Sequence, residues 1–446
     1  MPRIDRRDFV KGTAGAVAGL AGFQPHLVFG RQPDVKLRVG FIGVGGRGTG
    51  LLRLALRRGD IEVTAVCDID RAALENGKAL VHDARGREPA TYGSGEEDFR
   101  NLVARSDIDA VIIATPWLWH VPMAVAAMKA GKATAVEVPA AVTVEDCWEL
   151  VETHEQTGTP FQMLENVCYR RDVLAILHMV RQGMFGELMH CHAGYQHDLR
   201  AVKFQPGAEF GPGSTGEARW RTEHSIRRNG DLYPTHGVGP IGNWLDINRG
   251  NRFVSLTSTA TKSRGLHDYV VATGGQGHPN ASVKFALGDI VTTVIACANG
   301  ETVVVSHDTN LPRPYSLNFR VQGTRGLWMR DNRSLYIEGV SPDLHEWEDA
   351  GSYLERYDHP LWRRWESSAA GAGHGGMDFF VLHGFLEAVK RGEPTPLDVY
   401  DAAAWSVISP LSERSIAAGG APQAFPDFTG GRWVTRTPTF GFSDEY

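Results

Sequence analysis

The sequence predicts a doubly wound α/β domain with a parallel sheet, followed by an α+β domain built on a large, mostly antiparallel sheet. Three observations lead to this fold class. Strand-like and helix-like runs alternate over the first third of the chain, a glycine turn follows the first strand, and beyond residue 187 strand-like runs follow one another. We therefore expect a leader at 1–34, a nucleotide-binding domain at 35–166 and a second domain at 167–446.

The leader is a basic segment followed by small apolar residues. Arg6 and Arg7 precede Phe9 and Lys11, and a run rich in Gly and Ala follows. This pattern is typical of a twin-arginine export signal, so we expect a periplasmic or extracellular protein. The alternative is a frayed basic N-terminus. The apolar run is too short and too rich in glycine for a stable membrane span.

Composition and charge argue against several classes of partner. The formal net charge is −6, so the chain has no basic footprint and nucleic acid is not an expected partner. The cysteines are odd in number and irregularly spaced, which does not indicate a disulfide framework. We expect a small-molecule or glycan substrate, and the sequence leaves a homo-oligomer open.

The first strand runs into a glycine turn and then a helix. Gly43, Gly45 and Gly48 have the spacing of a Rossmann dinucleotide fingerprint, in which glycine permits a tight turn, approach to a pyrophosphate and close helix packing. A second strand ends just before Asp68, about 20 residues after Gly48. A carboxylate there accepts hydrogen bonds from the ribose of NAD and repels the extra phosphate of NADP, so we expect NAD. The alternative is a glycine-rich turn with a helix-capping Asp68.

Further buried strands are expected at 109–116, 133–139 and 160–166, with helices between them. Ligands of such a sheet bind beyond the carboxyl ends of its strands. Three of these ends carry polar or aromatic clusters: Trp117, Leu118, Trp119 and His120; Glu137 and Val138; and Asn166. For each residue alone, packing or capping is as good an explanation. Their shared position favours a binding site.

The second domain is predicted from strand-like runs at 187–197, 253–261, 281–287, 290–300, 302–309, 315–323 and 334–339. A helix at 172–184 precedes them, and amphipathic segments at 376–392 and 398–420 close the chain. His190 and His192 share one face of the first of these strands. Two ligands are too few for a metal site, so no metal is expected.

One segment of this domain is dense in chemistry. An apolar helix is expected directly after the run Tyr233, Pro234, Thr235 and His236. The start of this helix directs the side chain of His236 toward the group that faces the helix N-terminus. A histidine can move protons near neutral pH. Taken alone, a capping or core histidine is the more frequent explanation.

Stretches scattered between residues 36 and 435 carry a resemblance, among them "ENVCYRRDVLAILHMVRQGMFGEL", "NGDLYPTHGVGP", "HDTNLPRPY" and "GAGHGGMDFF". The architecture resembles the glucose–fructose oxidoreductase and inositol dehydrogenase superfamily. Within it, the local sequences are similar to the NAD-dependent glycosidases of glycoside hydrolase family 109. Because the matching stretches are long and spread along the chain, the resemblance is specific.

The resemblance explains the pair Glu137 and Val138. Dehydrogenases of the superfamily typically read Glu-Lys-Pro at this strand end, and the lysine helps to move the hydroxyl proton during net oxidation. Here Val138 takes the place of the lysine, as in family 109. The resemblance implies that Glu137 stays beside the nicotinamide ribose, and that the role of the lysine is filled elsewhere or abandoned.

The implied reaction differs from the two-carboxylate hydrolysis of most glycosidases. Bound NAD⁺ removes hydride from C3 of the sugar, a base removes the acidified C2 proton, and the aglycone leaves C1. Water then adds and the hydride returns, so NAD is catalytic and is not consumed. The implied substrate is a terminal, α-linked N-acetylgalactosamine.

The resemblance also assigns contacts. The implied cofactor contacts are Gly46, Arg47, Asp68, Trp117, Leu118, Trp119, His120, Glu137, Val138 and Asn166. The implied sugar contacts are Tyr195, Arg221, Tyr233, Pro234, Thr235, His236 and Tyr315. We expect catalysis to involve His236, Tyr195 and Glu137, with Tyr169 as a weaker candidate for proton transfer.

Two positions depart from the family pattern. The family commonly reads Trp-Glu-Trp-His where this chain has Leu118, so one polar contact to the cofactor is missing or is made by the backbone. Pro139 replaces a small polar residue but lies outside the implied contacts.

Three functional hypotheses follow. The leading one is an exported NAD-dependent glycosidase. The alternative is a sugar dehydrogenase or oxidoreductase of the same superfamily, with net oxidation or epimerisation. The third is an exported sugar-binding protein with a vestigial cofactor. A glycosidase releases p-nitrophenol from an aryl glycoside without net NADH, a dehydrogenase accumulates NADH, and a binding protein does neither.

Overall fold

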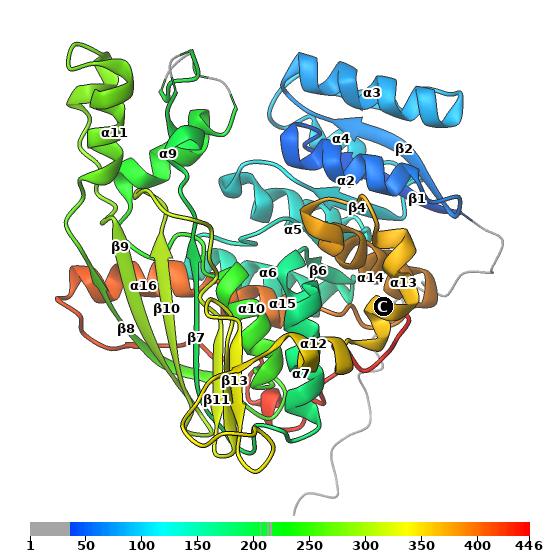
Figure 1. Cartoon of the computed structure of the whole chain (residues 1–446). Coiled ribbons are helices and arrows are strands. Elements are labelled where there is room, and N and C mark those ends of the chain that lie inside the picture. The colour runs from blue at the N-terminus through cyan, green and yellow to red at the C-terminus, as the bar shows by residue number, and fades with distance from the viewer. Residues whose placement is uncertain (1–35, 206, 212–213, 215) are drawn as a thin grey trace, which may run out of the picture.

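The computed structural model describes residues 36–205, 207–211, 214 and 216–446, arranged around two sheets (Figure 1). The expected leader, with Arg6 and Arg7, lies outside the described residues. The predicted fold class is confirmed: a six-stranded parallel sheet is followed by a nine-stranded mixed sheet.

The first sheet has the strand order β3-β2-β1-β4-β5-β6, and every neighbouring pair is parallel. Its strands are β1 (Leu37–Ile42), β2 (Ile61–Cys67), β3 (Ala90–Tyr92), β4 (Ala110–Ile113), β5 (Ala133–Val136) and β6 (Phe161–Met163). The helical segments between and after them are α2 (Gly46–Leu56), α3 (Arg71–Arg85), α4 (Phe99–Val103), η1 (Trp117–Trp119), α5 (His120–Lys129), α6 (Val144–Thr157) and η2 (Asn166–Tyr169). Its central strands are buried on both faces, which is typical of a parallel sheet covered by helices.

The register of this sheet brings the expected site residues together. Ile42 at the end of β1 pairs with Cys67 at the end of β2 and with Ile113 at the end of β4. Val136 at the end of β5 pairs with Ile113 and with Met163. Residues that directly follow these strands therefore meet at one edge of the sheet.

The second sheet has the order β14-β13-β12-β11-β7-β10-β9-β8-β15. Its strands are β7 (Leu188–Gln196), β8 (Phe253–Ala260), β9 (Ile290–Cys297), β10 (Thr302–Asp308), β11 (Arg320–Gly323), β12 (Gly326–Met329), β13 (Ser334–Ile337), β14 (Glu348–Asp349) and β15 (Gln423–Ala424). Only β7 and β10 pair in parallel, and the other neighbours are antiparallel.

Helices accompany this sheet and return to the first one. They are α7 (Arg171–Arg181), α8 (Arg200–Lys203), α9 (Ala218–Arg227), α10 (Thr235–Trp244), α11 (Gly265–Gly274), η3 (Pro279–Ser282), α12 (Gly351–Arg356), α13 (Pro360–Ala369), η4 (His374–Gly376), α14 (Met377–Arg391), α15 (Val399–Ser406), α16 (Ile408–Ala417) and η5 (Arg432–Val434). Helix α14 packs on α2, and α15 packs on α6 and β6. The end of the chain therefore helps to cover the first sheet (Figure 1).

Two expected strands differ in the structure. The run 281–287 is not a strand. Its apolar residues Ala281 and Phe285 pack in a small apolar cluster with Phe204, and this packing explains why apolar residues alternate in the run. In the run 315–323 only the last four residues form β11, because Asn318 takes a positive φ of 51° and interrupts the extended chain. The short strands β3, β12, β14 and β15 were not predicted.

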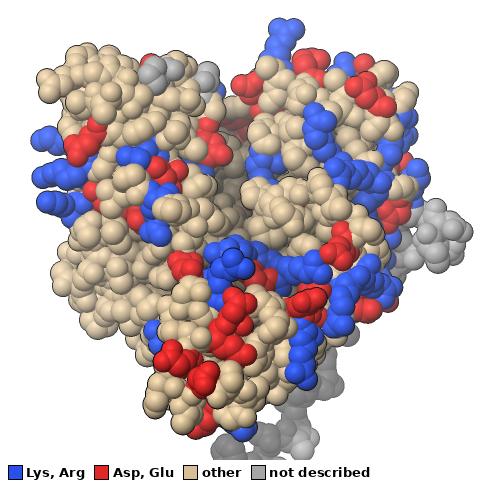
Figure 2. Space-filling model, in the orientation of Figure 1, with Lys and Arg blue, Asp and Glu red and all other residues tan. Residues whose placement is uncertain are grey.

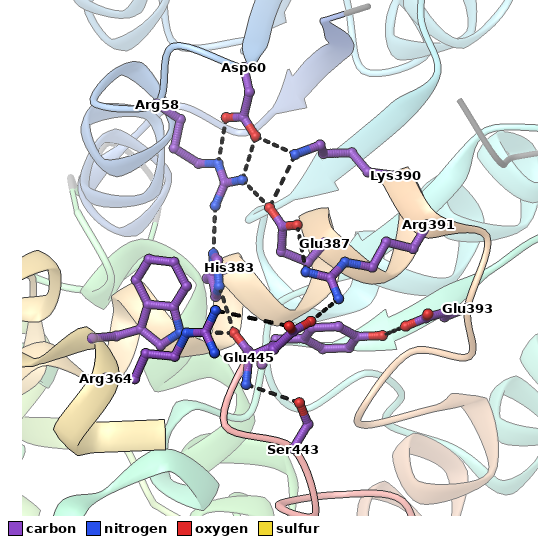
Figure 3. A network of polar contacts seen from close by, with 12 residues as sticks. Arg58, Asp60, Arg364, His383, Glu387, Lys390, Arg391, Glu393, Ser443 and Glu445 are labelled. Atoms are coloured by element: carbon purple, nitrogen blue, oxygen red, sulfur yellow. Dashed lines mark hydrogen bonds and ion pairs between the residues drawn. The ribbon is translucent and has the colours of Figure 1, made fainter. Parts of the chain in front are cut away.

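A polar network ties helix α14 both to the first domain and to the C-terminal tail (Figure 3). Arg58, which follows α2, contacts Asp60 and Glu387, and its Nη1 lies 2.6 Å from Nδ1 of His383. The other ring nitrogen of His383 donates to the carbonyl of Glu445 at 2.9 Å. Helix α14 is thus held to the first domain at its C-terminal end.

Other expectations concern cysteines, membranes and metals. All five cysteines lie within the described residues, where each is buried and free. No helix in the described part of the chain is long and apolar enough to cross a bilayer. Across the same residues no three His, Cys, Asp or Glu side chains group as metal ligands, and His190 contacts Thr302.

Candidate active site

A cleft of about 1660 Å³ opens at the carboxyl edge of the first sheet. Figure 2 shows the hollow between the lobe of α9 and α11 and the lobe of α2 and α3. Sixteen of the expected site residues line it: Gly43, Gly45, Gly46, Arg47, Asp68, Trp117, Leu118, Trp119, His120, Glu137, Val138, Asn166, Tyr195, Arg221, Tyr233 and His236. Residues of both domains thus share one cavity.

The glycine turn has the shape that a dinucleotide needs. Gly43 has φ +82°, and a Cβ there would lie 2.6 Å from the carbonyl oxygen of Ala114. Gly45 and Gly46 face open space, so the backbone at the start of α2 is accessible to a ligand. No acidic residue occupies the first turn of α2, so the positive end of the helix dipole is free to bind a pyrophosphate. Gly48 lies outside the cleft, and its added Cβ would fall 1.9 Å from the carbonyl oxygen of Gly43.

Asp68 closes the adenosine end of the cleft. Its Oδ2 accepts from the backbone N–H of Val44 at 2.8 Å, and its Oδ1 accepts from that of Asp70 at 2.9 Å. Burial raises the pKa of Asp68, while these backbone hydrogen bonds oppose the rise. Since the carboxylate is fixed beside the glycine turn, the residues fit NAD: Gly45 and Gly46 would hold the pyrophosphate and Asp68 the ribose.

Glu137 has a partner that explains a carboxylate among apolar residues. Its Oε1 accepts from Nε of Arg47 at 2.6 Å, and Nη1 of Arg47 donates to Asp378 Oδ2 at 2.7 Å. Arg47 therefore bridges the end of β5 and the start of α14. Val138 follows Glu137 and lines the cleft with an apolar side chain that cannot carry a proton.

Asp378 organises a second group of polar side chains. It accepts from Nδ2 of Asn166 at 2.7 Å and from Nδ1 of His374 at 2.8 Å. Burial alone would raise the pKa of Asp378, but the hydrogen bond from His374 and the charge of Arg47 lower it well below its usual range. In return, the hydrogen bond to Asp378 raises the pKa of His374, which is 58% exposed on a glycine-rich loop at the cleft.

His236 forms the other histidine–carboxylate pair. Its Nδ1 lies 2.7 and 2.9 Å from the two carboxylate oxygens of Glu165, which is fully buried. Helix α10 begins at Thr235 and approaches β7 closely, since a Cβ on Gly237 would lie 2.8 Å from the backbone nitrogen of Gly194. With Nδ1–H donating to Glu165, Nε2 is left as the proton acceptor of the ring.

Aromatic rings form the wall that joins the two domains. The Tyr233 ring lies 4.6 Å from the Tyr195 ring, 4.9 Å from the His236 ring and 5.6 Å from the Trp117 ring. The Arg221 guanidinium lies over Trp117 and Tyr233, at 5.3 and 5.1 Å. Burial raises the pKa of Tyr195 and that of Tyr233, so both phenols keep their protons near neutral pH. Such a wall of ring faces and hydroxyls suits a sugar.

The other strand-end residues have different surroundings. Leu118 is 64% exposed at the cleft. The two ring nitrogens of His120 each lie 2.8 Å from a carbonyl oxygen, of Pro139 and of Thr115. His120 therefore ties the end of β4 to the end of β5.

Five expected residues do not line the cleft. They are Gly48, Tyr169, Pro234, Thr235 and Tyr315. Pro234 and Thr235 are buried at the start of α10, where they place Tyr233 and His236. Tyr315 is 43% exposed, with its ring 4.9 Å from that of His197. It lies beside the aromatic wall.

Tyr169 is not placed for proton transfer. It is 1% exposed and stacks on Phe380, and its hydroxyl has no hydrogen-bond partner among the described residues. Burial raises its pKa far above the ordinary value. The structure assigns Tyr169 to the core, because the short helix η2 turns it away from the strand end.

Three site residues were not expected from the sequence: Glu165, His374 and Asp378. Glu165 directly precedes Asn166 at the end of β6, so its position was a usable signal. His374 and Asp378 come from "GAGHGGMDFF", more than 200 residues later in the chain. Only the packing of α14 on α2 brings them to the cleft.

Two family models match the chain. Residues 37–164 match the oxidoreductase family with an NAD-binding Rossmann fold, and residues 169–435 match the C-terminal domain of glycosyl hydrolase 109.

Full-length relatives agree. The chain is 53% identical over 456 residues to a glycosyl hydrolase family 109 protein of Stenotrophomonas maltophilia (strain K279a), covering 99% of each. It is 52% identical over 465 residues to an alpha-N-acetylgalactosaminidase of Tannerella forsythia, covering 98% of this chain and 99% of that protein.

Solved structures share the fold. A levoglucosan dehydrogenase in complex with NADH and L-sorbose superposes with a TM-score of 0.66 at 21% identity, over 89% of this chain and all of that chain. A scyllo-inositol dehydrogenase from Lactobacillus casei with bound NAD(H) and scyllo-inositol superposes with a TM-score of 0.61 at 13% identity, over 87% of this chain and 99% of that chain.

Proposed function

Because this chain belongs to glycosyl hydrolase family 109, we propose that it is an NAD-dependent glycosidase that releases terminal, α-linked N-acetylgalactosamine. One observation carries the proposal. His236, which is paired with the buried Glu165, lines the same cleft as the strand-end residues Glu137 and Asn166 of the NAD-binding sheet. Ordinary acid–base hydrolysis needs no such sheet.

NAD⁺, when bound, supplies reversible oxidation at C3 of the sugar, which makes the C2 proton acidic. His236 then acts as the base at C2. Glu165 holds the proton on Nδ1 and stabilises the charge that the ring acquires, so that Nε2 is the accepting atom. The buried position of Glu165 keeps the ring in one orientation.

His374 acts as the acid at the leaving oxygen. Its pKa is raised by the hydrogen bond to Asp378, so the ring holds a proton closer to neutral pH than a free histidine does. Its loop and its exposure give it access to an aglycone that extends out of the cleft. The two histidines thus divide the work of base and acid.

Val138 argues against net oxidation as the main activity. Val138 lines the cleft at the position where the superfamily's dehydrogenases typically carry a lysine and where family 109 carries a valine. The dehydrogenases that superpose on this chain share 21% identity or less and bear only on the fold.

The test is an aryl-glycoside assay on the purified protein. The α-anomer of p-nitrophenyl N-acetylgalactosaminide should release p-nitrophenol for many turnovers with no net NADH. Stoichiometric accumulation of NADH would instead establish a dehydrogenase. The absence of both p-nitrophenol and NADH would indicate a binding protein. Aryl glycosides of other sugars and of the β-anomer serve as controls for specificity.

We further propose that the protein is exported by the twin-arginine route to the periplasm or beyond. The proposal rests on Arg6, Arg7, Phe9 and Lys11. Folding before export suits a protein that carries a cofactor and five buried free thiols. Fractionation of cells that express the full chain tests it, and a wholly cytoplasmic location would contradict it.

We also propose that the protein forms a homo-oligomer. Val294 on β9 pairs with Val304 on β10, so both side chains share one face of the second sheet, and Val294 is 43% exposed there. Sedimentation analysis tests this proposal, and a monomer at all concentrations would overturn it.

A further inference from the structure

A second, much smaller cavity lies behind the aromatic wall of the cleft. Its volume is about 10 Å³, which is the room of a single water molecule. Tyr195 and Tyr233 line both this cavity and the cleft, while Lys203 and His307 line only the small one. The phenols are therefore the partition between the sugar site and a buried polar chamber.

Lys203 is an unusual residue to find there. It is 3% exposed, and its Nζ donates to Thr309 Oγ1 at 2.8 Å and to Asn310 Oδ1 at 2.7 Å. Neither partner is a carboxylate, and the described residues provide no third contact to Nζ. An ammonium group has three N–H donors, whereas a neutral amine has two and one lone pair. The surroundings of Lys203 match the neutral amine.

The charges that face Lys203 favour the same state. Burial lowers the pKa of Lys203 most, and the guanidinium of Arg221 on α9 lowers it further. Asp289 and Asp308, which precede β9 and end β10, act in the opposite direction, and the balance is a pKa of about 7. Burial lowers the pKa of His307 well below its usual range, and the charge of Arg221 acts in the same direction, so the ring is neutral.

The chamber also has an unused hydrogen-bonding atom. His307 borders it, and Nδ1 of His307 is buried with no partner among the described residues. A buried polar atom of this kind normally bonds to an ordered water. The cavity and the unpaired nitrogen therefore point to one water beside Lys203.

Tyr195 connects this chamber to the cleft. Its hydroxyl lies 3.1 Å from Nδ1 of His197, and the charge of Arg221 acts on the same phenol, opposing the rise of its pKa that burial causes. The charge of Arg221 also lowers the pKa of Lys203, and both residues line the small cavity. Tyr195 and Lys203 thus flank one guanidinium.

We propose that Lys203 is a positioning residue that stores the proton of the sugar's C3 hydroxyl, receiving it from the Tyr195 hydroxyl through one water in this chamber. The proposal rests on the proposed function, because only oxidation at C3 releases that proton. It gives the task of the superfamily's strand-end lysine, which Val138 cannot perform, to a lysine on α8.

The protons and electrons balance. When the C3 alcohol becomes a ketone, the electron pair of the C3–H bond leaves with its hydrogen to the bound NAD⁺, and the hydroxyl proton leaves separately. That proton goes to the oxygen of Tyr195 as Tyr195 gives its own proton to the water. The water passes a proton to the lone pair of Lys203, which becomes an ammonium. The reverse path restores the hydroxyl when the ketone is reduced at the end of the cycle.

The first experiment measures transient reduction of the bound nicotinamide by stopped-flow absorbance. Lys203→Arg keeps N–H donors at this position, but arginine is always protonated and cannot accept a proton. We expect both Lys203→Arg and Lys203→Met to slow this step by about 10²-fold or more. A merely structural cation would leave Lys203→Arg near the wild-type rate, and that result would overturn the proposal. Lys262→Met, on the surface, is the control for loss of a charge.

The second experiment needs no activity. The folded pKa of Lys203, about 7, lies below its ordinary value of 10.5, so the unfolded chain binds more protons between these pH values. The wild-type protein should therefore gain stability over Lys203→Met as pH rises above about 7, by up to tenfold in the unfolding constant per pH unit. Below pH 7 the difference should be constant. A difference that is flat from pH 7 to 9 would overturn the proposal.

The two failures can be told apart. If the wild-type protein neither reduces its nicotinamide transiently nor releases an aglycone, the proposed function is wrong. If the wild-type protein does both and Lys203→Arg matches it, only the role of Lys203 is wrong. Should Lys203→Met not fold, Lys203→Gln takes its place in the unfolding comparison.

Discussion

Nδ1 of His236 lies 2.7 Å from Oε1 of Glu165, a carboxylate that is fully buried. His236 lies at the start of α10, which packs on β7 of the second sheet, whereas Glu165 follows β6 of the first sheet, so the base of the proposed reaction forms only when the elements of the two sheets pack together. The same packing places His236 in the cleft that the glycine turn also lines.

His236→Ala should lower turnover by about 10² or more, the usual contribution of a lost acid–base group. Glu165→Gln should lower it in the same direction, because the amide no longer stabilises a charged ring. Turnover of an aryl glycoside measures both effects. Retention of NAD by the purified variants is the control, and near-normal turnover of His236→Ala would move the role of base to Tyr195.

Asp378→Asn should shift the pH dependence of turnover. His374 must be protonated to act as the acid, so activity falls as pH rises through its pKa, and Asp378 raises that pKa. Removing the carboxylate should move this alkaline fall to lower pH. Since Asp378 also contacts Arg47 and Asn166, the profile is measured at saturating NAD. An unchanged profile would rule out His374 as the acid.

Gly48→Ala should disrupt the dinucleotide turn. The new methyl group would lie 1.9 Å from the carbonyl oxygen of Gly43, and such overpacking costs about 1–3 kcal/mol. Gly50→Ala is the matched control, because its methyl group meets open space in the same helix. There alanine should be neutral or stabilise by up to about 1 kcal/mol. Urea unfolding measures both variants, and equal stabilities would contradict the packing role of Gly48.

Replacing both Arg6 and Arg7 by lysine should block export and leave a folded, active protein in the cytoplasm. The reason is that the twin-arginine route reads the arginine pair and not the charge alone. Immunoblots of cell fractions and an aryl-glycoside assay of the cytoplasm check the two parts. Normal export of the double variant would refute the assignment of the signal.

Much of the nucleotide-binding domain could be predicted because its signals are local. The strand before Gly43, the glycine spacing and Asp68 lie within one stretch of chain, and the parallel register aligns every strand end. The same logic located Glu137 and Asn166. It failed for Tyr169, because a three-ten turn after β6 rotates that side chain into the core.

The missing parts of the site depend on contacts that are distant in sequence. His374 and Asp378 reach the cleft only through the packing of α14 on α2. No local pattern in the sequence distinguishes Lys203, whereas its burial by α9 and by the loop after β10 does. The run 281–287 misled for a related reason, since its alternating residues pack in a loop cluster.

The most direct test of the account is the reaction in D₂O. If His236 removes the C2 proton during turnover, the base exchanges with solvent, and the released sugar should carry deuterium at C2. The C3 hydrogen should stay, because it passes to the bound cofactor and back without entering solvent. Mass spectrometry and proton NMR of the product distinguish the two positions. A released sugar that keeps its original C2 hydrogen after complete hydrolysis in D₂O would contradict the redox mechanism for this protein.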